Sequence, residues 1–237
     1  MNKIINKILN CSGYQEIDIC LHQDLAELNL FKPSVMNNRQ EYFLVVRLHV
    51  QSDKSAKQFL ECCAQDWFDK IVKSGFVGQE FEKNCTLILC HKEDQINRNT
   101  ILIIEEDQYN FKKNVITYTD IELTDLLRYI DNNQLINLNE EVINRVINEN
   151  GGMSFLKCKS NNKEEKDYYS LVLKSILKLP FISYIPQEQK LANLTGEIEQ
   201  SLSPSQLSIY KKLIESYELW EDENIEEKVE DIWGPNS

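Results

Sequence analysis

The sequence contains few glycines, and this limits the ligands that its own loops can hold. Seven glycines occur among the 237 residues. None of them belongs to a glycine-rich segment that is followed by Lys and then Ser or Thr, which is the pattern of a phosphate-binding loop. A phosphate-binding loop needs glycines because its backbone N–H groups must approach the phosphates closely. We therefore predict no nucleotide cofactor, and expect any ATP that this protein depends on to be bound by a partner.

Histidine is also scarce, which limits the choice of a catalytic base. The three histidines are His22, His49 and His91, and each lies at or near the end of a predicted strand. Strand ends can converge, so a pair of Cys20 or Cys90 with one of these histidines stays open. No local signature of a nucleophile supports such a pair. We interpret the histidines as structural or surface residues and predict no catalytic residue.

Positive charge is in short supply, and so are long apolar runs. The chain has 26 Lys and Arg against 38 Asp and Glu, a formal net charge of -12. Proteins that bind nucleic acid neutralise phosphates with clustered basic residues, so we expect DNA contact to be indirect or local. A membrane helix needs about 20 apolar residues in succession, which the sequence lacks. The first residues resemble no secretory signal, and we expect a cytoplasmic protein without membrane contact.

No CxxC pair exists among the seven cysteines. Cys85 and Cys90 bracket a predicted strand, and alternation places them on opposite faces of a sheet. Cys62 and Cys63 are adjacent on a predicted helix and point about 100° apart. We therefore predict reduced, mostly buried thiols and no metal site.

The first half of the chain alternates strand and helix patterns. Residues 42–50 (YFLVVRLHV) are rich in β-branched and aromatic side chains, which predicts a central strand, and residues 16–22 form a weaker candidate beside it. Apolar residues at steps of three and four predict an amphipathic helix over 55–73. Two further apolar runs, 85–90 and 100–106, predict strands, which gives a β-α-β-β arrangement.

Helices dominate the remaining sequence. Thr119 and Glu122 form a capping box, in which each side chain satisfies the other residue's backbone N–H, and so begin a helix. Another helix starts at Asn139 and stops at Gly151-Gly152. Two later helices follow, one through Tyr169–Leu177 and one after the N-cap Ser203.

These patterns predict an α+β protein. A small mixed β-sheet with packing helices forms the N-terminal part, and the C-terminal part is mainly helical. We place an α/β domain at 1–158, a polar linker or loop at 159–167, and a helical region with an acidic tail at 168–237.

An acidic cluster follows the run at 100–106. Glu105, Glu106 and Asp107 precede Phe111, Lys112 and Lys113. Carboxylates near a lysine at a strand end suit Mg²⁺, so a metal-dependent nuclease that uses Glu105 or Asp107 is one interpretation. Such nucleases usually have an acidic residue two positions before a lysine, so that both side chains lie on the same face of a strand. This pairing is missing in residues 105–113.

The acidic tail has its own apolar stripe. Ile225, Val229, Ile232 and Trp233 lie among carboxylates at helical intervals, and Trp220 precedes them. A solvated terminal helix or a disordered segment is one interpretation. The other is a segment that docks this stripe in a partner's groove while its carboxylates meet a basic rim.

The run TLILCHK…TILIIEEDQYNFKKNVITYTDIEL, together with EYFLVVRL, resembles the middle component of bacterial ABC-three-component defence systems, which include the accessory subunit of Lamassu-type systems. The resemblance covers residues 42–135. It implies a complex with an SMC or Rad50-like coiled-coil ATPase that senses DNA, and with an effector, commonly a nuclease, that acts against phages or plasmids. An acidic scaffold suits docking on basic surfaces.

We therefore predict a non-catalytic accessory subunit that bridges the ATPase and the effector. The predicted partner interface comprises Glu105, Glu106, Asp107, Phe111, Lys112, Lys113, Trp220, Ile225, Val229 and Trp233. Two alternatives remain, a nuclease effector and an acidic, antitoxin-like inhibitor of a DNA-binding protein. For the interface itself, the alternative is that Phe111 and Tyr118 are core residues and the charges only solvate a turn.

Overall fold

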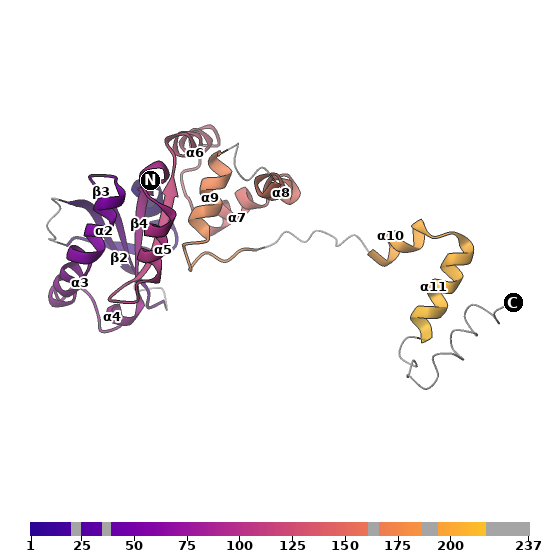
Figure 1. Ribbon diagram of the computed structural model, residues 1–237, viewed down its shortest axis with the longest axis horizontal. Coiled ribbons are helices and arrows are strands. Elements are labelled where there is room, and N and C mark those ends of the chain that lie inside the picture. The colour runs from indigo at the N-terminus through magenta and orange to yellow at the C-terminus, as the bar shows by residue number, and fades with distance from the viewer. Residues whose placement is uncertain (20–24, 35–38, 161–165, 186–193, 217–237) are drawn as a thin grey trace. The chain divides into compact units, whose positions relative to one another are not determined.

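The computed structural model describes residues 1–19, 25–34, 39–160, 166–185 and 194–216. The chain divides into two compact units, Met1–Pro186 and Gln187–Ser237 (Figure 1). The described part of the second unit consists of α10 (Leu194–Ser201) and α11 (Pro204–Ser216). At the predicted N-cap of α11, the backbone N–H of Ser203 donates to Gln206 Oε1 and the backbone N–H of Gln206 donates to Ser203 Oγ, the two reciprocal bonds of a capping box.

A five-stranded sheet forms the centre of the first unit. Its strands, in spatial as well as sequence order, are β1 (Tyr14–Ile17), β2 (Ala26–Pro33), β3 (Tyr42–Leu48), β4 (Cys85–Lys92) and β5 (Lys112–Tyr118). The first three strands pair antiparallel, whereas β3, β4 and β5 pair parallel. The sheet is therefore mixed, and the predicted α+β class is confirmed.

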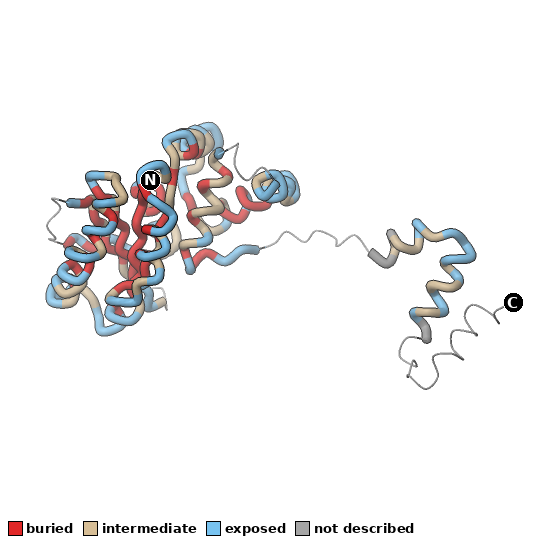
Figure 2. Tube along the Cα trace, in the orientation of Figure 1, coloured by how far each residue is buried: buried red, intermediate tan, exposed pale blue. Residues whose placement is uncertain are grey.

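Both faces of the sheet are buried (Figure 2). Along β4, Leu87 and Leu89 contribute to one apolar cluster while Ile88 contributes to the other, as strand alternation requires. Cys85 and Cys90 fall into different clusters, which confirms that they lie on opposite faces. Burial raises the pKa of the Cys90 thiol to about 12, so this thiol stays protonated at neutral pH.

Helices that are close in sequence to the strands cover the first face. They are α2 (Asp53–Gln58), the π-helical turn η1 (Phe59–Cys63), α3 (Ala64–Lys73), α4 (Phe81–Asn84) and α5 (Arg98–Glu106). The predicted helix over 55–73 is therefore present, with Trp67 and Ile71 packed in the core. Its N-cap is Ser52, whose hydroxyl accepts the backbone N–H of Ser55 at 3.1 Å.

Helices from both ends of the unit cover the second face. They are α1 (Asn2–Cys11), α6 (Asp120–Asn132), α7 (Glu140–Ile147) and α9 (Tyr168–Ile176). The short turns η2 (Glu93–Gln95) and η3 (Glu149–Gly152), and the helix α8 (Met153–Ser160), complete the unit. The predicted capping box at the start of α6 is confirmed, with both reciprocal bonds between Thr119 and Glu122 present.

The predicted strand over 100–106 is wrong, because these residues form α5. A short apolar run fits a buried strand and a helix equally well when only its periodicity is considered. The topology decides between them, since β4 and β5 are parallel and parallel neighbours need a crossover connection, which α5 supplies. Within α5 only Thr100 and Ile104, one turn apart, are buried.

Two strands N-terminal to β3, β1 and β2, belong to the sheet as well, and α1 packs on its second face. α1 and β2 were not predicted, and β1 ends at Ile17, while residues 20–22 of the predicted strand lie outside the described residues. Residues 161–165 of the predicted linker lie outside the described residues, while Leu171 of α9, in the predicted C-terminal region, packs in the same cluster as the sheet. The division between the units falls later, at Pro186.

Candidate partner interface

Glu105, a predicted interface residue, is bound within the chain at the end of α5. Its carboxylate accepts the backbone N–H of Val115 at 2.8 Å and forms an ion pair with Lys178 at 2.7 Å. Val115 belongs to β5, the last strand of the sheet. Glu105 thus satisfies one backbone N–H of an edge strand. Without this bond, the N–H could pair with a strand of another chain.

Asp107 and Lys113 form a second internal pair. The Lys113 side chain is 1% exposed, and its ammonium contacts the Asp107 carboxylate at 2.5 Å. It also donates to the carbonyl oxygens of Tyr109 and Phe111. A buried ammonium needs such acceptors to offset its lost hydration. Lys113 therefore holds the turn between α5 and β5 and does not lie on the surface.

Phe111 is a core residue. It is 1% exposed, and its ring lies 5.2 Å from that of Phe68 and 6.2 Å from that of Phe81, both in edge-to-face geometry. Tyr118 is also buried, at 2% exposed. The alternative that both aromatic residues belong to the core is confirmed.

Glu106 and Lys112 are the exposed members of the predicted interface near α5. On the same helix, Leu102 is 43% and Ile103 is 52% exposed, and Tyr109 in the following turn is 76% exposed. We call these five residues the α5 surface. The other four predicted residues, Trp220, Ile225, Val229 and Trp233, lie outside the described residues.

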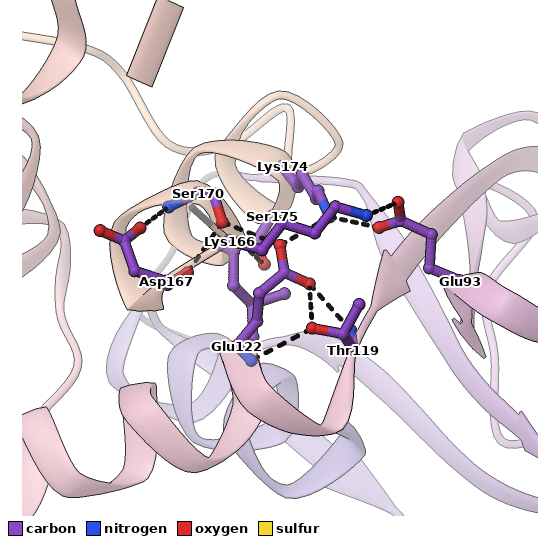
Figure 3. Close-up of polar contacts among 9 residues, drawn as sticks. Glu93, Thr119, Glu122, Lys166, Asp167, Ser170, Lys174 and Ser175 are labelled. Carbon is purple, nitrogen blue, oxygen red and sulfur yellow. Dashed lines mark hydrogen bonds and ion pairs between the residues drawn. The ribbon is translucent and has the colours of Figure 1, made fainter. Parts of the chain in front are cut away.

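Ion pairs join α9 to η2, which directly follows β4, and to the start of α6 (Figure 3). The Lys174 ammonium contacts Glu93 at 2.5 Å and Glu122 at 2.7 Å. Glu93 also pairs with Lys166, and Ser170 donates its hydroxyl to Glu122 at 2.8 Å. We call these five residues the α9 seam.

The electrostatics of the α9 seam favour its charged state. Burial alone would raise the pKa of Glu93, but hydrogen bonds from Lys166 and Lys174 outweigh it and lower the pKa below its usual value. For Lys174, burial lowers the pKa, and the bonds to Glu122 and Glu93 outweigh it and raise the pKa. Glu122 is fully buried, so its carboxylate depends on these partners.

Several side chains that could bind a metal ion near α5 and β4 contact other groups of the chain. No group of three or more His, Cys, Asp and Glu is placed to hold a metal ion within the described residues. Glu105 and Asp107 each face a lysine, and His91 is buried with its Nδ1 2.9 Å from the carbonyl oxygen of Lys92. Among the helices of the described ranges, none has both the length and the apolar content needed to cross a bilayer.

Comparison with known proteins places part of this chain in a family context. Residues 42–150 match the family model described as ABC-three component (ABC-3C) system Middle Component 1. The matched residues make up a little less than half of the chain. The Middle Component 1 segment runs from β3 into η3, so it contains the α5 surface, Glu93 and Glu122, but not the lysines of the α9 seam. Searches of curated proteins and of solved structures gave no significant match.

Sequence reasoning found one member of the α9 seam and missed the others. Glu122 was identified through its capping box, a local pattern in which residues three apart satisfy each other. The partners Lys174 and Ser170 lie 52 and 48 residues away, and no short-range pattern connects them to Glu122.

Proposed function

We propose that this protein is the non-catalytic middle component of an ABC-three-component defence system, of the kind found in Lamassu-type systems. It bridges an SMC or Rad50-like ATPase, which senses DNA, and an effector, commonly a nuclease. The observation that carries the proposal is the match of residues 42–150 to Middle Component 1.

The chemistry of the chain agrees with a scaffold role. The described carboxylates that a nuclease would use, Glu105 and Asp107, are paired with Lys178 and Lys113. A formal charge of -12 favours basic protein surfaces over nucleic acid. Exposed apolar side chains on the α5 surface, bordered by Glu106 and Lys112, are of the type that partner interfaces bury.

Co-purification of the tagged chain with the products of its neighbouring genes tests the proposal. We expect a coiled-coil ATPase to co-purify in a fixed ratio, with or without an effector, as measured by the mass of the intact complex. A monomer or homodimer without companions contradicts the bridging role.

The α5 surface is tested in the same experiment. Ile103→Asp with Tyr109→Ala should reduce recovery of one partner at least about tenfold, since a few buried apolar anchors dominate most interfaces. The matched control is Ile121→Asp on α6, which is 68% exposed and lies outside the α5 surface.

Nuclease activity of the purified chain is the other outcome to be measured. We expect no Mg²⁺-dependent cleavage of DNA by the protein alone. Cleavage that Glu105→Ala and Asp107→Ala together abolish would favour the nuclease interpretation instead.

A further inference from the structure

A polar stripe on α7 binds an extended segment of the same chain. The backbone N–H of Ser183 donates to Glu140 Oε1 at 2.8 Å, and Asn144 Nδ2 donates to the carbonyl oxygen of Ser183 at 2.9 Å. The N–H of Ile185 then donates to Asn144 Oδ1 at 2.8 Å, and Asn148 Nδ2 donates to the carbonyl oxygen of Ile185 at 3.0 Å. Alternate residues of the segment thus have both backbone groups satisfied by α7.

The spacing of the stripe has a geometric explanation. Glu140, Asn144 and Asn148, the C-cap residue of α7, are four residues apart, and four residues advance an α-helix by about 6 Å. Two residues of extended chain advance by about 6.6 Å. The two distances are nearly equal. Successive side chains of the stripe therefore lie opposite every second residue of the extended segment, and these residues are the ones whose backbone groups point towards α7.

The two asparagines are placed where they need these bonds. Asn144 is 7% exposed and Asn148 is 9% exposed, and asparagine is a weak helix former. Each Nδ2 group also donates to a carbonyl oxygen one turn earlier, that of Glu140 for Asn144 and that of Asn144 for Asn148. The backbone groups of Ser183 and Ile185 add further partners to these buried amides, and burial of a polar group favours such bonds.

The stripe recognises backbone and makes little use of side chains. Tyr184 and Ile185 are 56% and 61% exposed, and Ser183 is exposed as well. The Tyr184 hydroxyl donates to Asn148 Oδ1 at 3.2 Å, whereas the four contacts of Ser183 and Ile185 with the stripe are made by their backbone groups. Other extended sequences therefore satisfy the same donors and acceptors.

We propose that the Glu140, Asn144 and Asn148 stripe is a binding site for an extended polypeptide segment. Residues 183–185 occupy it in the free chain, and an extended segment of a partner subunit takes their place in the complex. The identity of the competing segment rests on the proposed function, whereas the peptide site itself does not. Buried Phe181 and Ile182 keep the displaced segment attached to the core.

Titration of the isotopically labelled full chain with the peptide FISYIP, the sequence of residues 181–186, tests the site by NMR. The observed signals are the side-chain amides of Asn144 and Asn148. The protein is used as wild type and as Ser183→Pro/Ile185→Pro, which removes both N–H groups that the stripe accepts. We expect the double variant to bind the peptide at least about tenfold more tightly than wild type, because the internal competitor is weakened.

The peptide supplies its own controls. Methylation of the backbone nitrogens at the positions of Ser183 and Ile185 should abolish binding, whereas methylation at Tyr184 should not, since α7 bonds alternate residues. Adding Asn144→Ala to the double variant should return the affinity to the wild-type level or below. Arg145→Ala, an exposed neighbour paired with Glu141, is the matched control on the same helix.

Equal affinity of wild type and double variant, or binding that Asn144→Ala leaves unchanged, would overturn the proposal. If the double variant does not fold, hydrogen exchange of wild type with excess peptide decides. The amides of Ser183 and Ile185 should then exchange faster with peptide than without, and unchanged rates overturn the proposal. No other subunit is present in these experiments, so their failure is distinguishable from failure to co-purify an ATPase.

Discussion

The two faces of the sheet are covered in different ways. The first face is closed by helices that lie between its strands in sequence, from α2 to α5. The second face is closed by α1, from the start of the chain, and by α6, α7 and α9, which follow the last strand. Apolar packing is common to both, but the second face adds the ion pairs of the α9 seam.

This difference shows how distant segments are held in place. The helices of the first face lie in connections whose two ends are both fixed in strands of the sheet, so the chain itself keeps them near the sheet. Lys174 reaches Glu122 across 52 residues, and here specific charge pairs fix the position of α9. The acids of the seam lie in the Middle Component 1 segment, while its lysines lie beyond the matched residues.

The largest expected effect concerns the first face. Phe111→Ala should lower the free energy of unfolding by about 3–5 kcal/mol, because it leaves a cavity among Phe68 and Phe81. Denaturant unfolding of the purified chain measures this change. Lys112→Ala, at the exposed neighbouring position, should change stability by about 0.5 kcal/mol or less. An unchanged stability for Phe111→Ala would contradict its place in the core.

A smaller loss is expected on the second face. Lys174→Met should reduce the free energy of unfolding by about 3 kcal/mol, since it leaves the buried Glu122 carboxylate without its cation. Lys70→Met, which breaks an exposed pair with Asp66 on α3, should cost at most about 1 kcal/mol. Similar losses for the two variants in urea unfolding would remove the distinction between the seam and an ordinary surface pair.

The smallest effect is a pH dependence within the seam. Because the pKa of Glu93 is lower in the folded chain, its contribution to stability is present above the usual glutamate value and is lost as pH falls through the folded value. Glu93→Gln should therefore reduce the loss of stability on acidification, by about 1 kcal/mol or less for a partly exposed group. Urea unfolding of both proteins between neutral and acidic pH measures the difference. If the free energy of unfolding depends on pH in the same way for both proteins, Glu93 does not contribute to the pH dependence of stability.

Local patterns in the sequence determined the elements whose signals lie within a few residues. The strand at Tyr42, the amphipathic helix from α2 to α3, and the capping box at Thr119 are all of this kind. Alternation along β4 also correctly separated Cys85 from Cys90, because the side-chain period of a strand is fixed.

The tertiary structure decided what these patterns left open. The run at 100–106 became helical because the parallel pairing of β4 and β5 needs a crossover. Phe111 and Lys113 belong to the predicted interface, but both are buried in the structure because β5 joins the sheet at this point. The α9 seam and the α7 stripe depend on residues that are distant in sequence, and only folding brings their donors and acceptors together.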